Sequence, residues 1–492
     1  MSALPVPADA TLPATTAQLF IDNEAVPAQT GQTLPVVDPS TGTVFGQIAR
    51  GQRDDVDRAV RSARRAFDGP WGRTDAAQRG RLLLKLAQLV EREREPLARI
   101  ESRDTGKPLR QARADATALA RYFEFYGGAA DKLHGQTLPY QEGYTVMTLR
   151  EPHGVTGHIV PWNYPMQIFG RSVGASLAAG NACVVKPAED ACLSLLRIGE
   201  LAAEAGLPPG TLNIVPGLGA EAGQALAEHP GVDHLSFTGS TDTGRRVAQA
   251  AAAHFCPVTL ELGGKSPQLV FADADLQAAM PVLVNAIIQN AGQTCSAGSR
   301  ILVERSIYDA TVAQLAERFA ALRAGPASAD LDLGPLVTRK QQQRVWDFLS
   351  DAQASDLRFA AQGQIVDHAP SEGFYQAPVL LADVPIEHRL SQHEIFGPVL
   401  IVTPFDDEAQ ALAFANGTDY GLVAGVWTQD GARQMRIARR LQSGQVFINN
   451  YGAGGGVELP FGGVKHSGYG REKGFEALYA FTSLKTVAIR HG

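Results

Sequence analysis

One cysteine, Cys295, stands among small and hydroxyl-bearing residues in Gly-Gln-Thr-Cys-Ser-Ala-Gly, residues 292–298. The sequence predicts a helix over 275–291 that Gly292 ends, so that Cys295 lies on a tight connection before a strand over 300–305. A substrate can reach a cysteine on such a loop. Because a free thiol is only slightly ionised near neutral pH, a nucleophilic Cys295 needs a lowered pKa or a nearby base. Without either, an inert thiol is the simpler interpretation.

Glu261 interrupts an apolar strand pattern in Leu-Glu-Leu-Gly-Gly-Lys-Ser-Pro, residues 260–267. Burying a carboxylate is costly, so the residue needs an explanation. It is either a salt-bridged or capping residue, or a general base whose pKa is raised by apolar surroundings and which activates a water. Gly263 and Gly264 beside it would let another backbone or a cofactor approach closely.

Asn163 follows a predicted strand in Pro-Trp-Asn-Tyr-Pro, residues 161–165. The two prolines fix the local backbone. A side-chain amide held in this way is a good hydrogen-bond donor to an oxyanion. The alternative is an Asx-turn, which is the common role of an isolated asparagine.

Two further strand ends carry residues suited to a nucleotide. In Phe-Thr-Gly-Ser-Thr, residues 237–241, Gly239 and Ser240 precede a helix, whose N-terminus could bind a phosphate or could simply be capped by the serine. In Lys-Pro-Ala-Glu, Lys186 and Glu189 lie at a strand-to-helix turn. They could bind ribose hydroxyls, because ligands bind at strand ends of parallel sheets, or form a solvated surface pair.

The elements that must position these residues alternate between short apolar strands and helices, which is the pattern of parallel sheets. Strands are predicted over 157–162, 182–187, 212–217 and 234–239, and in a second series over 266–273, 300–305, 398–405, 422–428 and 445–449. Helices of the second series are predicted over 275–291, 306–324 and 430–442. The fold class is therefore α/β, with two α/β layers.

Three regions flank this alternation. Residues 53–134 contain several helical patterns, and 144–155 form a β-rich alternation typical of a protruding strand or hairpin. The terminal stretch 482–490 is β-like and suits pairing with another element or another subunit. The first sixteen residues lack the pattern of a signal peptide and are interpreted as a flexible arm.

Composition narrows the class of protein. With 44 Lys and Arg against 51 Asp and Glu, the net charge is −7, and no basic cluster suggests nucleic acid or an anionic membrane. Four cysteines without a CxxC pair, in 492 residues, indicate reduced thiols and a cytoplasmic location. We expect Cys183, Cys192 and Cys256 to be small buried residues. No cluster has metal-ligand spacing, so no catalytic metal is expected.

Taken in order, the motifs Pro-Trp-Asn-Tyr-Pro, Lys-Pro-Ala-Glu, Phe-Thr-Gly-Ser-Thr, Leu-Glu-Leu-Gly-Gly-Lys-Ser-Pro, Gly-Gln-Thr-Cys and Glu-Ile-Phe-Gly-Pro-Val resemble the aldehyde dehydrogenase superfamily. The resemblance extends from about residue 18 to the end. Glu261 and Cys295 are 34 residues apart, which is similar to the family's spacing, and Pro-Phe-Gly-Gly-Val-Lys-His-Ser-Gly-Tyr-Gly-Arg-Glu-Lys-Gly resembles its C-terminal signature.

The resemblance implies a domain organisation. A Rossmann-like NAD-binding domain would comprise 1–134 and 153–263, and an α/β catalytic domain 264–474. A small β oligomerisation arm would comprise 135–152 and 475–492. A homodimer or homotetramer is implied as well.

The resemblance also implies catalytic roles. Cys295 would attack the aldehyde carbon, and Asn163 with the Cys295 backbone N–H would hold the oxyanion of the thiohemiacetal. After hydride transfer to the nicotinamide, Glu261 would deprotonate a water that hydrolyses the thioester to a carboxylic acid.

The cofactor site implied by the resemblance consists of Ile159, Trp162, Lys186, Glu189, Gly239, Ser240, Leu262, Glu394 and Phe396. Lys186 and Glu189 would bind the adenosine ribose, Ser240 the pyrophosphate and Glu394 the nicotinamide ribose. Because a carboxylate accepts hydrogen bonds from a 2′-hydroxyl but repels a 2′-phosphate, Glu189 favours NAD over NADP.

The substrate tunnel implied by the resemblance is lined by Tyr164, Gln167, Ile168, Arg171 and Phe461. An arginine at 171 resembles the succinic semialdehyde branch, in which it binds the substrate carboxylate. That branch has a second arginine where this chain has Gln289, so Arg171 either binds a carboxylate or pairs with solvent. Four glycines within 452–456 favour a wide entrance for a bulky, aromatic or keto-bearing aldehyde, or simply a mobile loop.

Four other functions are alternatives to the hydrolytic oxidation of a bulky aldehyde or a semialdehyde. A CoA-acylating semialdehyde dehydrogenase would share the cysteine but generally lacks the base at 261. A betaine or aminoaldehyde dehydrogenase would bind a cation, which Arg171 opposes. A structural homologue without activity should have lost catalytic residues, and these are present. A thiol hydrolase needs a histidine near the cysteine, whereas His158 is expected in the core and His466 at the surface.

Overall fold

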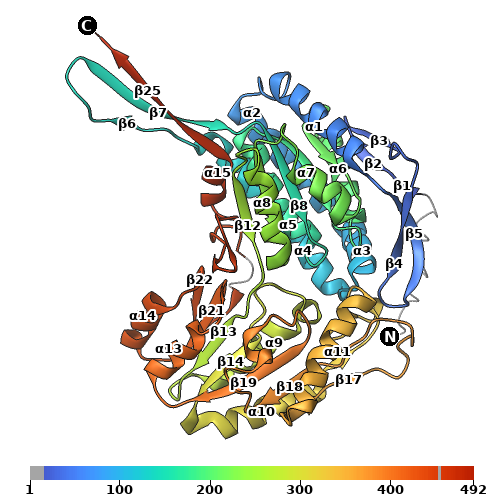
Figure 1. The fold of residues 1–492 in the computed structure, drawn as a ribbon, viewed down its shortest axis with the longest axis vertical. Helices are drawn as coiled ribbons and strands as arrows, with labels where there is room; N and C mark the ends of the chain where they lie inside the picture. The colour runs from blue at the N-terminus through green and yellow to red at the C-terminus, as the bar shows by residue number, and fades with distance from the viewer. Residues whose placement is uncertain (1–15, 453–455, 492) are drawn as a thin grey trace, which may run out of the picture.

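The structure of the protein is a computed structural model that describes residues 16–452 and 456–491. The chain forms an upper body, a lower body and a long β arm that leaves the upper body and carries the C-terminus at its tip (Figure 1). The predicted N-terminal arm falls almost entirely outside the described residues, and so do two of the four glycines of the predicted wide entrance, Gly454 and Gly455.

The upper body is built on an eight-stranded sheet. Its strands, in spatial order, are β24 (Gly468–Tyr469), β12 (Val258–Glu261), β11 (His234–Thr238), β8 (Val155–Val160), β9 (Ala182–Pro187), β10 (Leu212–Ile214), β2 (Leu19–Ile21) and β3 (Glu24–Val26). The five central strands, β12 to β10, are parallel, and the strands beyond them at either end are antiparallel. All four predicted strands of the first series are present, although β8 begins and ends two residues earlier than predicted and β10 ends at Ile214.

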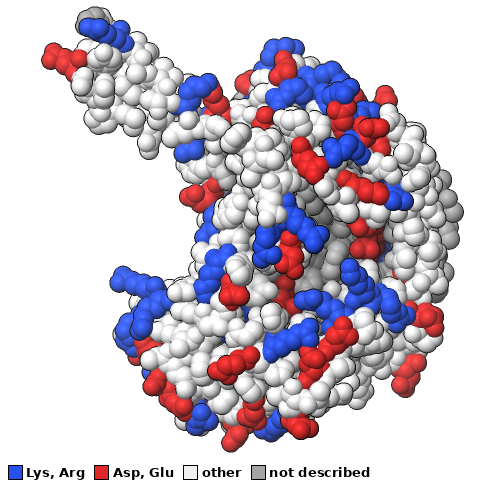
Figure 2. Space-filling view, in the orientation of Figure 1, with Lys and Arg blue, Asp and Glu red and all other residues white. Residues whose placement is uncertain are grey.

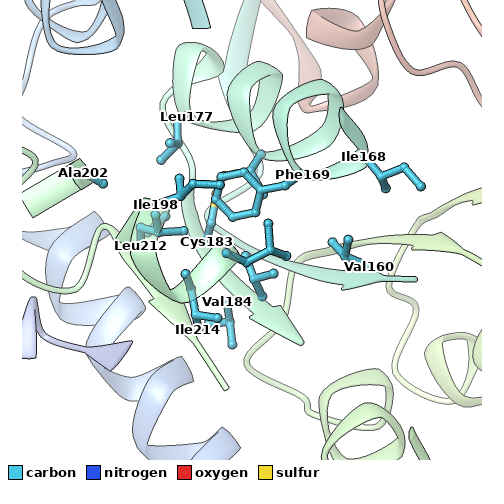
Figure 3. Packing of buried hydrophobic residues seen from close by; sticks show 14 of the residues in the cluster. Val160, Ile168, Phe169, Leu177, Cys183, Val184, Ile198, Ala202, Leu212 and Ile214 are labelled. Atoms are coloured by element: carbon cyan, nitrogen blue, oxygen red, sulfur yellow. The ribbon is translucent and has the colours of Figure 1, made fainter. Parts of the chain in front are cut away.

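Helices cover the faces of this sheet. They are α1 (Arg53–Asp68), α2 (Ala76–Arg92), α3 (Arg94–Thr105), α4 (Leu109–Ala129), α5 (Pro165–Ala179), α6 (Leu193–Ala205), α7 (Gln224–Ala227) and α8 (Thr241–Ala252). Nearly every residue of α5 is buried, which is expected of a helix that is apolar on all sides. Figure 3 shows Phe169 of α5 packed near Cys183 of β9 and Ile198 of α6. This packing fixes α5, and with it the residues that precede it.

The lower body contains a seven-stranded sheet. Its strands, in spatial order, are β16 (Arg358–Gln362), β18 (Val379–Ala382), β19 (Val399–Phe405), β14 (Arg300–Glu304), β13 (Pro267–Val270), β21 (Val423–Trp427) and β22 (Gln445–Ile448). All pairs are parallel except β16 with β18. Its helices include α9 (Leu276–Ile288), α10 (Tyr308–Ala321), α11 (Arg339–Ala354), α13 (Glu408–Asn416) and α14 (Gly431–Arg440). The α/β class predicted from the sequence is confirmed.

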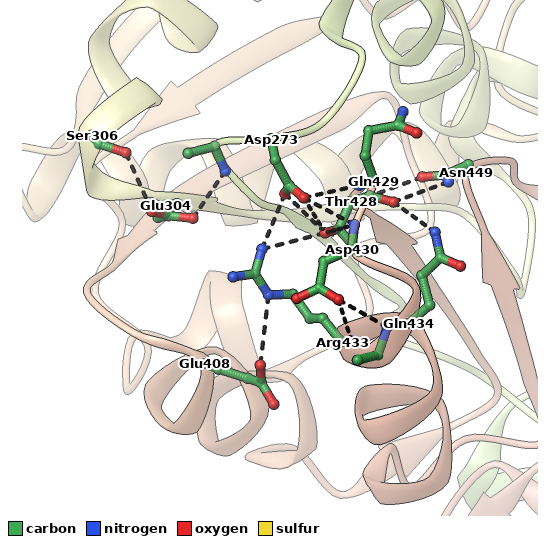
Figure 4. Close-up of polar contacts among 12 residues, drawn as sticks. Asp273, Glu304, Ser306, Glu408, Thr428, Gln429, Asp430, Arg433, Gln434 and Asn449 are labelled. Atoms are coloured by element: carbon green, nitrogen blue, oxygen red, sulfur yellow. Dashed lines mark hydrogen bonds and ion pairs between the residues drawn. The ribbon is translucent and has the colours of Figure 1, made fainter.

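A cluster of polar contacts at one end of the lower sheet joins the residues after β13 to α13 and α14 (Figure 4). Asp273, just beyond β13, accepts hydrogen bonds from the Thr428 hydroxyl at 2.8 Å and from two backbone N–H groups before α14. Arg433 of α14 donates to Asp273 at 3.0 Å and lies 3.6 Å from Glu408 of α13. The cluster therefore connects α13 and α14 to the end of β13.

The arm consists of β6 (Thr137–Leu138), β7 (Tyr144–Pro152) and β25 (Thr482–Arg490). The strand predicted over 482–490 pairs antiparallel with β7 along its whole length. It therefore pairs with another element of the same chain, which is one of the two partners predicted for it. A short helix, α15 (Glu476–Ala480), joins the arm to the upper body.

The sequence missed several elements. A small sheet of β1 (Thr16–Ala17), β5 (Thr43–Ala49) and β4 (Thr33–Asp38) covers one side of the upper body, and α11 was not predicted. The short strands of the first fifty residues give little periodic signal. On the face shown in Figure 2 the molecule is hollowed between its two bodies, with side chains of both charges around the hollow. In the described ranges, no helix has the length and apolar character needed to cross a membrane.

Candidate active site

The order of the upper strands places several candidate residues at one edge. The chain runs from β8 to β9 on one side of the sheet and returns to β11 on the other, so β8 and β11 are neighbours. In an open α/β sheet, ligands bind beyond the carboxyl ends of the strands at such a reversal. Trp162 and Asn163 follow β8, and Gly239 and Ser240 follow β11. The topology thus explains why residues distant in sequence share this edge.

Cys295 lies on a connection that is tighter than the sequence predicts. The predicted helix end at residue 291 is wrong, because α9 ends at Ile288 and a short 3-10 turn follows. Asn290 and Ala291 have left-handed φ angles of 48° and 52°, and Gly292 has 75°. A Cβ on Gly292 would lie 2.2 Å from the Gly397 carbonyl oxygen, so only glycine fits there. This turn reverses the chain and presents Cys295.

Asn163 belongs to a buried amide network around the cysteine loop. Its Nδ2 donates to the Gln293 carbonyl at 3.0 Å, and its own carbonyl accepts from Asn290 Nδ2 at 2.8 Å. Gln293 is fixed in turn by the Val337 backbone N–H at 3.0 Å. Since a side-chain amide has two N–H donors, Asn163 keeps one for a ligand. This arrangement is more constrained than a simple Asx-turn.

Replacing Asn163 with alanine is expected to lower the kcat of the reaction at Cys295 by about 10²-fold to 10³-fold, the usual loss for one oxyanion donor. The KM should change less, because the donor acts mainly on the charge that develops during reaction. Steady-state kinetics would measure both, and the folded fraction would be checked by the melting temperature. A variant with wild-type kcat would contradict the assigned role.

A single cavity of about 380 Å³ brings most of the predicted catalytic and substrate residues together. Cys295 and Asn163 line it, as do Tyr164, Gln167, Ile168, Arg171 and Phe461. Tyr164 and Thr294 lie side by side, with their hydroxyl oxygens 3.0 Å apart. The volume falls in the range of small-molecule sites. Glu261 is not among the described residues that line this cavity.

The Cys295 thiol does not have the lowered pKa that was one of its two predicted routes to activation. Burial raises its pKa to about 12, although the charge of Arg171 and the Ser296 backbone N–H act in the opposite direction. The negative charges of Glu394 and Glu261 raise it further. The resting thiol therefore keeps its proton, and a reaction at Cys295 requires a base.

Glu261 is the last residue of β12 and is 1% exposed. Neither carboxylate oxygen has a hydrogen-bond partner among the described residues, so the salt-bridged and capping interpretations do not hold. Burial raises its pKa well above the usual value, while the charge of Arg171 lowers it. A buried carboxylate with no partner is the kind of group that a general base requires.

The C-terminal segment encloses Glu261. In the paired strands β24 and β12, Gly468 lies opposite Glu261, and a Cβ added to Gly462 would lie 2.8 Å from its carboxylate. The Ser467 hydroxyl donates to the Gly263 carbonyl at 2.7 Å. The glycines of this segment therefore permit the close approach that keeps Glu261 away from bulk water.

Arg171 has an internal partner that the sequence did not reveal. It is 6% exposed and forms an ion pair with Glu472, so the interpretation as a solvent-paired arginine is wrong. Glu472 is fully buried and accepts a hydrogen bond from Ser236 at 2.7 Å. The Arg171 guanidinium also lies 5.0 Å from the centre of the Phe461 ring. Glu472 lies within the C-terminal signature, but nothing in the sequence pairs it with Arg171, which precedes it by about 300 residues.

The predicted polar cofactor residues lie at the end of β9, at the start of α8, and beside Gly264. Lys186 donates to Glu189 at 2.9 Å at the end of β9, with the lysine buried and the glutamate partly exposed. Ser240 caps α8 by accepting from the Thr243 N–H. The Gly264 N–H donates to Glu394 at 3.0 Å, and burial raises the pKa of that carboxyl to about 7.

Aromatic and apolar residues complete these groups. The Trp162 and Phe396 rings meet edge to face at 5.4 Å. Ile159 in β8 is partly exposed, whereas Leu262 after β12 is buried against Gly244 of α8. A Cβ on Gly239 would lie 2.6 Å from the Phe237 ring. At residue 239 only glycine therefore fits beside this ring without a shift.

Further residues support the site without a sequence signal. Below Tyr164, the buried Lys107 pairs with Glu101 and Asp115, and its Nζ lies 4.1 Å from the centre of the Tyr164 ring. On the opposite side, Arg344 of α11 donates to the Glu394 carbonyl at 2.6 Å. In the sequence these charges look like ordinary polar faces of helices.

Comparisons with known proteins agree with this geometry. The family model described as the aldehyde dehydrogenase family matches residues 25–487. A hydroxyisobutyraldehyde dehydrogenase of Mycolicibacterium austroafricanum is 42% identical over 97% of this chain and 94% of its own length.

Solved structures agree as well. The crystal structure of a protein assigned as an aldehyde dehydrogenase from Burkholderia cenocepacia is 71% identical, with a TM-score of 0.96 over 97% of this chain and 100% of that chain. An NAD⁺ complex of an aldehyde dehydrogenase from Bacillus cereus is 40% identical, with a TM-score of 0.93 over 97% of both chains. A family model spanning nearly the whole chain, a curated relative and solved structures all agree: this chain belongs to the aldehyde dehydrogenase family.

Proposed function

We propose that the protein oxidises an aldehyde to a carboxylic acid with NAD as the electron acceptor, through a covalent intermediate on Cys295. The observation that carries the proposal is the shared cavity of Cys295 and Asn163, beside a buried carboxylate, Glu261, that has no partner among the described residues. These are the nucleophile, the oxyanion donor and the base that the reaction requires.

The chain's own residues perform the following steps. The Cys295 thiol gives its proton to a base in the solvent, and its sulfur attacks the aldehyde carbon. The free N–H of Asn163 and the Cys295 backbone N–H hold the oxyanion of the thiohemiacetal. When bound, NAD supplies the ring that accepts the hydride. The thioester then remains on Cys295. Glu261 takes a proton from water, the resulting hydroxide attacks the thioester carbon, and the acid and thiol are released.

The residues at the strand ends fit NAD. Lys186 and Glu189 suit ribose hydroxyls, and the N-terminus of α8 at Ser240 suits a phosphate. The carboxylate of Glu394, beside Gly263 and Gly264, suits the second ribose. The NAD⁺ complex of the relative from Bacillus cereus supports the same cofactor. Glu189 would disfavour the 2′-phosphate of NADP.

The test is an assay with NAD, benzaldehyde and no CoA. We expect one NADH and one benzoate per turnover, and a kcat/KM with NADP well below that with NAD. The absorbance of NADH and chromatography of the acid would measure the two products. Dependence on added CoA would favour the acylating alternative, and a preference for NADP would overturn the role of Glu189.

Three further assignments belong to the same proposal. Residues 1–134 and 153–263 form the NAD-binding domain and 264–474 the catalytic domain, although β24 of the latter range adds to the upper sheet. The arm, 135–152 and 475–492, joins copies into a homodimer or homotetramer. The location is cytoplasmic, in keeping with free cysteines that are mostly buried.

A further inference from the structure

The backbone that presents Cys295 is strained over three consecutive residues. Asn290, Ala291 and Gly292 have φ angles of 48°, 52° and 75°. Glycine adopts the left-handed region freely and asparagine tolerates it, but alanine reaches it only at a cost. Such a conformation persists only where surrounding contacts hold it. The contacts made by this turn, residues 289–295, therefore determine where the Cys295 sulfur lies.

The left-handed turn leaves one backbone donor without a helical partner. In an unbroken α9 the Asn290 N–H would donate to the Ala286 carbonyl, which instead accepts from the Gly298 N–H at 3.0 Å. Asn290 is 2% exposed, so a donor without a partner would be costly here. The acceptor is the Gln111 side chain, whose Oε1 lies 2.9 Å from the Asn290 nitrogen. A residue 179 positions earlier thus completes the hydrogen bonding of the turn.

Gln111 lies at the junction between the two bodies. It belongs to the first turn of α4, directly after Arg110, whose backbone N–H donates to the Asp330 carboxylate of the lower body at 2.8 Å. On the side of the upper body, the buried Lys107 pairs with Asp115, which lies one turn of α4 beyond Gln111. The start of α4 is therefore fastened to both bodies, and the Gln111 side chain extends from a fixed position.

The other contact from the upper body holds a different part of the turn. The Asn163 side chain donates to the Gln293 carbonyl at 3.0 Å, two residues before Cys295. At the beginning of the turn, the Asn290 side chain donates to the Asn163 carbonyl, and its backbone N–H donates to Gln111. The bond to Gln111 acts directly on the backbone of a left-handed residue. Removing the Gln111 oxygen would therefore free the strained end of the turn and leave the Asn163 amide in place.

We propose that Gln111 is a positioning residue for the reaction at Cys295: by accepting the Asn290 N–H, it keeps the left-handed turn in the conformation that brings the sulfur beside Asn163. The inference rests on the proposed function and adds to it a residue that acts through the turn. Gln111 also lines the cavity, so the alternative is that it only shapes the substrate wall. The two roles predict different kinetics, because a misplaced nucleophile slows the chemical step, whereas a lost wall contact weakens binding.

The test replaces Gln111 with methionine, which has a similar length but no oxygen. Rapid mixing of the full-length enzyme with saturating NAD and a series of benzaldehyde concentrations measures the formation of NADH in the first turnover. We expect the maximum rate to fall about tenfold to 10²-fold in Gln111→Met, with the half-saturating benzaldehyde concentration within about twofold of the wild type. Gln88→Met, the same change at an exposed glutamine of α2, is the control that should alter neither value.

Hydrogen exchange provides a second readout that does not depend on activity. Measured by mass spectrometry on peptides that cover 289–295, exchange of the turn should be at least about threefold faster in Gln111→Met than in the wild type. Gln111→Glu keeps an acceptor oxygen at the same reach, so it should retain the protection of the wild type. Exchange over the rest of the chain should be unchanged in both variants, because the bond is local.

Two outcomes would overturn the positioning role. One is wild-type exchange over 289–295 in Gln111→Met. The other is an unchanged maximum rate with a raised half-saturating concentration, which would make Gln111 part of the substrate wall alone. A wild-type enzyme that forms no NADH with any aldehyde would refute the proposed function instead, and the exchange results would still show whether Gln111 holds the turn.

Discussion

Changing Cys295 to alanine is expected to lower NAD-dependent aldehyde oxidation by at least about 10⁴-fold, because no other cysteine among the described residues lines the cavity. Cys295→Ser should be nearly as inactive, since a hydroxyl holds its proton more tightly than a thiol. Melting temperatures should stay close to that of the wild type, because Cys295 is only partly buried on a loop. The measurement is NADH absorbance under saturating NAD and aldehyde.

The other cysteines provide matched controls for Cys295. Cys256 is buried just before β12, and burial raises its pKa to about 12, as it does for Cys295. Only Cys295, however, lines the cavity together with Asn163. Cys256→Ala should therefore keep wild-type kcat. Substantial activity in Cys295→Ala, or its loss in Cys256→Ala, would remove the nucleophile from the mechanism.

This contrast shows what the sequence could predict about the site. Local patterns singled out Cys295, Glu261 and Asn163 as candidates, but they left an inert thiol, a salt-bridged carboxylate and an Asx-turn open. Their catalytic roles came only from the resemblance of the ordered motifs to a family. Most parallel strands of the two large sheets were predictable, since their apolar runs are short and bounded by glycine or proline. The short strands of the first fifty residues were not.

The residues that hold the site's charged and backbone groups in place could not be predicted. Glu472 pairs with Arg171 across about 300 residues, and Arg344 holds the backbone of Glu394 from a helix that was not predicted. Such contacts depend on how the two bodies are joined, and no periodicity or spacing encodes them. The raised pKa of Cys295 could not be predicted either, because its burial follows from packing and not from its neighbours in the chain.

Replacing Glu261 with glutamine is expected to stop the reaction after one turnover. Glutamine keeps the shape but cannot accept a proton from water, so the thioester on Cys295 should accumulate. Steady-state turnover should fall about 10²-fold to 10⁴-fold. Rapid mixing with NAD and benzaldehyde should still give a burst of about one NADH per subunit. A steady rate without a burst would mean that Glu261 acts mainly before the thioester forms.

The pH dependence of steady-state turnover is an independent test of the role of Glu261. Burial raises the pKa of Glu261 well above the usual value, and only its deprotonated form can act as a base. In the wild type, steady-state turnover should therefore rise as the pH increases through the raised pKa of Glu261, and fall as the pH drops below it and the carboxyl is protonated. The rise that belongs to Glu261 should be absent from Glu261→Gln. An identical pH profile in both enzymes would contradict this assignment.

An external nucleophile separates hydrolysis from the earlier steps. Hydroxylamine attacks a thioester without needing a base to deprotonate it, so it should restore turnover to Glu261→Gln and yield a hydroxamic acid. It should not restore Cys295→Ala, which has no thioester to release. Rescue of the first variant and not the second would mean that the two residues act in sequence, with Cys295 forming the intermediate and Glu261 discharging it. Glu261 is buried and its charge acts on the Cys295 thiol, so this pair of variants tests directly whether the two residues serve successive steps.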